Sequence, residues 1–70
     1  MRMHFDELFT NQNGMVAPKV NVHINGVTMG PGVSFGGGVS FGGVDLTQLI
    51  GKYFDVEIQN GVHIIKGVFN

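Results

Sequence analysis

Apolar and polar residues alternate along much of the chain, most clearly in the segment from Lys19 to Met29. The pair Asn25-Gly26 lies near its centre, and both residues tolerate the positive φ angles that a two-residue hairpin turn requires. With such a turn, apolar and polar side chains separate onto opposite faces. The apolar face holds Val20, Val22, Ile24, Val27 and Met29, and the polar face holds Lys19, Asn21, His23 and Thr28. The pattern therefore predicts a β-hairpin with Ile24 opposite Val27.

The glycine-containing segment that follows predicts two further strands on the same sheet. Three-residue turns over residues 30–32 and 36–38 bring strands 33–35 and 39–41 into antiparallel register. The predicted pairs are Met29 with Val33, Val27 with Phe35, Phe35 with Val39, Ser34 with Ser40, and Val33 with Phe41. Because four strands then present one common apolar face, we expect a continuous β-meander.

Two short segments favour helical turns. Asp45 can cap a helix from Leu46 to Ile50 that Gly51 ends, so we expect a short helix at 45–51. Near the N-terminus, apolar residues at helical spacing favour a short amphipathic turn, with a hairpin around residues 11–14 as the alternative. These residues are Phe5, Leu8 and Phe9.

A second strong hairpin is predicted from Tyr53 to Phe69, around the pair Asn60-Gly61. A three-residue loop, Gln59 to Gly61, groups most apolar side chains on one face and places Gly61 in a bulge position. That face holds Phe54, Val56, Ile58, Val62 and Ile64, and the other holds Tyr53, Asp55, Glu57, His63, Ile65 and Phe69. In this register Glu57 lies opposite His63.

Together these elements predict a single, mainly β domain over residues 1–70. We expect a small antiparallel meander or barrel of five to seven short strands with one or two short helical turns. Residues 1–17 form an N-terminal arm or short helix, and residues 18–70 form the meander.

Composition adds an expectation of self-association. Only 13% of the residues are charged, against about 25% in an average domain. A chain of 70 residues buries only about 60% of its unfolded surface, and no cysteine is available for a disulfide. Sheet edges that pair between identical chains would enlarge the core, so we expect a homo-oligomer.

Charge and hydropathy argue against nucleic acid and membranes as partners. The net charge is −1 and the four basic residues are dispersed, so no phosphate-driven binding of nucleic acid is expected. No apolar run approaches the 18 or more residues of a membrane span. The first ten residues lack the apolar core of a signal peptide, and we expect a cytoplasmic protein.

Three groups of residues are candidates for chemistry. Glu57 could orient His63 for acid–base catalysis, with His23 nearby, in a site between subunits. Gly36, Gly37 and Gly38, with Ser34 and Ser40, could cradle an anion or small ligand, although the lysine and helix of a phosphate loop are missing. His4, His23 and His63 do not share the spacing of a zinc site, so we predict no metal or cofactor.

These observations favour a non-catalytic binding or interaction module that acts as a homo-oligomer. The first alternative is a small oligomeric enzyme that uses His63 and Glu57. The second is small-ligand or anion binding at the glycine-rich loops.

Overall fold

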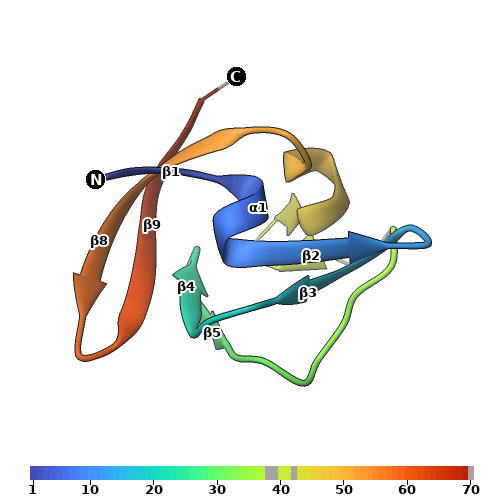
Figure 1. Ribbon diagram of the computed structural model, residues 1–70, viewed down its shortest axis with the longest axis horizontal. Coiled ribbons are helices and arrows are strands. Elements are labelled where there is room, and N and C mark those ends of the chain that lie inside the picture. Colours follow the sequence, from blue (N-terminus) through green and yellow to red (C-terminus); the bar gives the residue numbers. More distant parts are fainter. Residues whose placement is uncertain (38–39, 42, 70) are drawn as a thin grey trace.

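The computed structural model describes residues 1–37, 40–41 and 43–69, and within these ranges the chain is mainly β, as predicted (Figure 1). Nine strands and two short helical turns lie in the described residues. In chain order they are β1 (Arg2–His4), α1 (Phe5–Leu8), β2 (Phe9–Gln12), β3 (Met15–Pro18), β4 (Val22–Ile24), β5 (Val27–Met29), β6 (Ser40–Phe41), β7 (Val44–Asp45), the 3-10 helix η1 (Leu46–Leu49), β8 (Tyr53–Gln59) and β9 (Val62–Phe69).

The main sheet joins the two predicted hairpins side by side. Its strand order is β1-β8-β9-β4-β5, and β9 pairs with β4 in parallel, while the other pairs are antiparallel. The strands β2 and β3 form a separate hairpin, and so do β6 and β7. The chain therefore contains several hairpins, but consecutive strands do not follow one another across a single sheet.

The first hairpin has the predicted register. Ile24 pairs with Val27, His23 with Thr28, and Val22 with Met29. Asn25 and Gly26 have φ angles of 48° and 83°, so both turn residues are left-handed, as a two-residue turn requires. The predicted apolar face is the buried one, since Val22, Ile24 and Met29 belong to the core.

The predicted continuation of the meander is wrong. Phe35 does not pair with Val27; it exchanges two backbone hydrogen bonds with Val16 of β3, with N···O distances of 2.8 and 2.9 Å. Ser40 pairs with Asp45 and Phe41 with Val44, which excludes the predicted Ser34–Ser40 and Val33–Phe41 pairs. Val33 lies outside the strands and does not pair with Met29. Val39, the predicted partner of Phe35, lies outside the described residues.

A close contact explains why this segment lies along β3. A Cβ atom at Gly36 would lie 3.3 Å from Sδ of Met15, so glycine lets the chain pass close under that side chain. Val16 is fully buried, and its unpaired backbone edge needs a partner, which Phe35 supplies. The demand of β3 for hydrogen bonds therefore outweighs the side-chain pattern that favoured pairing with β5.

The second hairpin has a different register from the predicted one. Gln59 pairs with Val62, Ile58 with His63, and Glu57 with Ile64, so the turn contains only Asn60 and Gly61. Their φ angles are 52° and 78°, as in the first hairpin. The bulge lies farther along β9, at the register shift opposite Asp55 and Val56, and not at Gly61.

The core lies between the main sheet and a second layer formed by α1, β2, β3 and η1 (Figure 1). Phe5, Phe9 and Phe54 form an aromatic cluster, with the rings of Phe5 and Phe9 stacked at 5.0 Å. Both N-terminal alternatives are present, because the short helix α1 is followed directly by the hairpin β2–β3.

The predicted helix near residue 45 is also present. It is a 3-10 helix, and the side chain of Asp45 caps it by accepting a hydrogen bond from the backbone N–H of Thr47 at 2.9 Å. The chain turns out of this element through Gly51, whose φ angle is 82°. No helix in the described ranges is long and apolar enough to cross a membrane.

Candidate functional site

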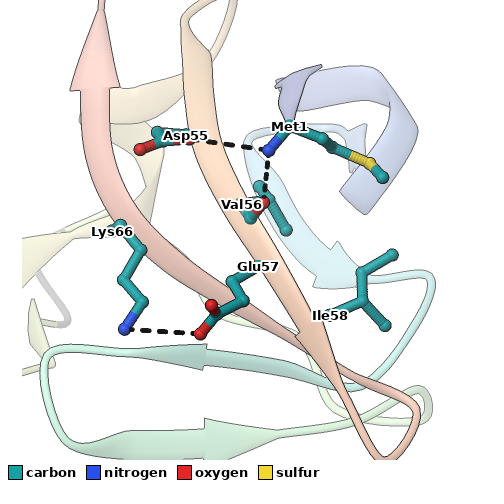
Figure 2. Close-up of a pocket in the computed structure, with 6 residues that line it drawn as sticks. All are labelled: Met1, Asp55, Val56, Glu57, Ile58 and Lys66. Carbon is teal, nitrogen blue, oxygen red and sulfur yellow. Dashed lines mark hydrogen bonds and ion pairs between the residues drawn. The ribbon is translucent and has the colours of Figure 1, made fainter.

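A hollow lies along β8, next to the start of β1 (Figure 2). It is shallow, with a volume of about 460 Å³. Its lining residues are Met1, Asp55, Val56, Glu57, Ile58 and Lys66. The hollow is therefore formed by residues 55–58 of β8, by Lys66 of the neighbouring strand β9, and by Met1, which precedes β1.

The backbone of β8 is only partly paired on this side. Arg2, Met3 and His4 pair with residues 53–55, and Met1 exchanges two further hydrogen bonds with Val56, at 2.6 and 2.7 Å. Within the described part of the chain, no strand pairs with this side of β8 beyond Val56. Alternate residues of an antiparallel strand direct their N–H and C=O groups to the same side. The N–H and C=O groups of Ile58 therefore point into the open edge.

Apolar side chains flank this open edge on one side of β8. In Figure 2 the side chains of Met1 and Ile58 extend to the same side of the strand. They are 65% and 47% exposed, whereas Val56, between them, is buried in the core. The exposure follows from the length of the hairpin, because its tip extends past the last core residue of β8.

Charged side chains line the other side of the strand. The N-terminal ammonium lies 3.6 Å from Oδ1 of Asp55, and Nζ of Lys66 lies 3.7 Å from Oε2 of Glu57. The amide of Gln59 also donates a hydrogen bond to Oε2 of Glu57 at 2.7 Å. These side chains are about half exposed, so the ion pairs add little to folding stability and their charges remain accessible.

The predicted acid–base pair does not form within the chain. Glu57 lies opposite Ile64, while His63 lies opposite Ile58, so the two side chains leave the sheet on different faces. Nδ1 of His63 lies 3.2 Å from the carbonyl oxygen of Asn21, and Nδ1 of His23 lies 2.8 Å from Oγ1 of Thr28. The two-residue turn is the physical cause, since shortening the loop by one residue moves His63 to the other face.

The glycine-rich segment does not gather its predicted ligand-binding residues. Gly36 passes under Met15, Gly37 lies near Thr47, and Ser34 is exposed outside the strands. Ser40 pairs with Asp45, whose carboxylate caps η1 and opposes binding of an anion nearby. Gly38 lies outside the described residues.

A second, smaller cavity of about 110 Å³ lies between the bulge of β9 and η1. Its walls are mostly apolar, and they comprise Ile24, Asn25, Val44, Leu49, Ile65, Lys66, Gly67 and Val68.

Among the described residues, no three His, Asp or Glu side chains lie close enough together to hold a metal ion.

The sequence matches no protein-family model, and it shows no significant similarity to a curated protein or a solved structure. The candidate site therefore depends on geometry alone. The sequence pattern groups Ile58 with Phe54 and Val56 on one face and does not single out Met1 or Lys66 as site residues. The signal for Ile58 was its position two residues before the turn, at the end of the longer hairpin.

Proposed function

We propose that this protein is a non-catalytic interaction module that acts as a homo-oligomer, and that copies meet at the open edge of β8. We call this edge, formed by Glu57, Ile58 and Gln59, the β8 edge. The observation that carries the proposal is the combination of outward-pointing backbone groups and an exposed apolar side chain at Ile58. An added strand satisfies such groups and covers such a side chain at once.

The distribution of exposed apolar side chains supports this location. Four large apolar residues on β8 and β9 are 40% exposed or more. They are Tyr53, Ile58, Val68 and Phe69. The guanidinium carbon of Arg2 lies 4.6 Å from the centre of the Phe69 ring, whereas Ile58 is 47% exposed. Association at the tip of the hairpin would remove the most exposed of these four side chains from water.

The charges around the β8 edge also permit contact between identical surfaces. Two carboxylates, Asp55 and Glu57, each lie beside a cationic group. The local charge is therefore balanced, and a second copy meets no uncompensated charge of like sign.

Sedimentation velocity over a wide range of protein concentrations tests the proposal. We expect a concentration-dependent increase in mass, and Ile58→Lys should shift the chain to the monomer. Val33→Lys is the matched control, because Val33 is 44% exposed and lies outside the β8 edge. A monomer at every concentration, or equal loss of association in both variants, would contradict the proposal. Circular dichroism establishes that both variants fold.

A further inference from the structure

We infer that two copies pair through the β8 edge in one antiparallel register, with Ile58 of each copy opposite Ile58 of the other. This inference depends on the proposed self-association and specifies its geometry. In this register the N–H and C=O groups of the two Ile58 residues satisfy each other, and Glu57 of each copy lies opposite Gln59 of the other.

The ends of the β8 edge exclude the neighbouring two-fold registers. A register centred on Glu57 would place Ile58 opposite Val56 of the second copy, whose backbone is already bonded to Met1. A register centred on Gln59 would place Ile58 opposite Asn60, which lies in the turn with a φ angle of 52°. Only the register centred on Ile58 joins two strand residues whose backbone groups both face the open edge.

The space along β8 fits a short pairing of this kind. Met1 occupies the position opposite Val56 and therefore limits an added strand to residues 57–59. At Asn60 the chain of the second copy turns away toward its own β9, so it departs from the β8 edge next to Met1 of the first copy. The pairing is short, and we accordingly expect a reversible dimer whose population depends on concentration.

The side chains of this register are complementary. The amide of Gln59 already donates to the carboxylate of Glu57 within one chain, at 2.7 Å, and both side chains are exposed. The same groups can bond across the two-fold axis, where a carboxylate faces an amide on each side. The two Ile58 side chains lie side by side at the centre, with Met1 of each copy on the same side of its own strand.

Disulfide trapping tests the register, because the natural chain contains no cysteine. In the proposed register the two Ile58 residues form a hydrogen-bonded pair, whose Cα atoms lie about 5.5 Å apart in an antiparallel ladder, within the range of a disulfide. We expect Ile58→Cys to form a covalent dimer rapidly under mild oxidation, and Val33→Cys to remain largely monomeric. Equal cross-linking of the two variants would overturn the register.

Substitutions of Gln59 separate failure of the register from failure of the proposed function. Gln59→Lys places a cation opposite Glu57 of the other copy and should lower the dissociation constant several-fold, while Gln59→Glu should raise it several-fold. If the natural chain associates but neither Gln59 variant changes the dissociation constant and the Ile58→Cys variant does not cross-link, self-association stands and this register is wrong. If the natural chain remains monomeric, both proposals fall.

Discussion

The two Asn-Gly hairpins of the main sheet have the same turn but different surroundings. In β4–β5 the last apolar residue before the turn, Ile24, is 2% exposed, whereas in β8–β9 the corresponding residue, Ile58, is 47% exposed. In each turn both residues have positive φ angles. The difference lies in length, because β8 and β9 continue past the core and the shorter strands do not. A turn signal thus locates a hairpin without determining which part of it is buried.

The largest expected effect compares the same substitution at these two isoleucines. Ile24→Ala removes a buried side chain and should lower the free energy of unfolding by about 2–5 kcal/mol. Ile58→Ala, measured at a concentration where the chain is monomeric, should lower it by only about 0.5 kcal/mol. Chemical denaturation gives both values. Similar losses at the two positions would show that the tip of the long hairpin is covered in the folded chain.

A smaller effect is expected at the turn glycines. Gly26 and Gly61 have φ angles of 83° and 78°, and a side chain in this region costs about 1–2 kcal/mol. We expect Gly26→Ala to reach the upper part of this range, because its hairpin is tied to the core through Ile24. Gly61→Ala should fall lower, since the tip can fray while Phe54 and Val56 stay buried. Thermal unfolding of the two variants gives the order, and a reversed order would contradict the comparison.

These hairpins also show how far the sequence determines the fold. The alternation around Asn25-Gly26 predicted every pair of β4–β5, because only one register separates its apolar and polar side chains. Around Asn60-Gly61 two registers each leave apolar residues on both faces, so the pattern did not determine the loop length. The bulge at Lys66 then places Ile65 and Val68 beside Val56 and Phe54, the strand residues with which they pair.

The candidate site was less predictable than the hairpins. The site depends on how far the pairing of β1 extends along β8. The segment Arg2–His4 carries no alternation of apolar and polar residues that predicts a strand. The pairing of Phe35 with Val16 was hidden for a related reason, since it satisfies a backbone edge and leaves no mark in the side-chain pattern. Long-range backbone pairing is therefore the part of this fold that side-chain periodicity does not determine.

A modest stabilisation is expected at Gly67 in the long hairpin. This glycine lies within β9 and does not have a positive φ angle, unlike Gly61 in the turn. A Cβ atom there would meet Cζ of Phe69 at 3.8 Å and Cβ of Asp55 at 3.9 Å, which are ordinary contacts. Gly67→Ala should therefore raise the free energy of unfolding by about 0.5–1 kcal/mol. A loss of stability would show that the strand beside the bulge needs conformations open only to glycine.

The smallest effect is expected at Lys66, which lies in the bulged part of β9 and contacts Glu57 at 3.7 Å. Both side chains are more than half exposed, so Lys66→Ala should lower the free energy of unfolding by no more than about 0.5 kcal/mol. Lys66→Arg keeps the charge and is the control, and chemical denaturation at low and high salt gives the comparison. The effect should shrink further in salt, because screening weakens an exposed ion pair. A loss above about 2 kcal/mol would instead assign the alkyl chain of Lys66 a packing role, since an exposed ion pair does not supply that much.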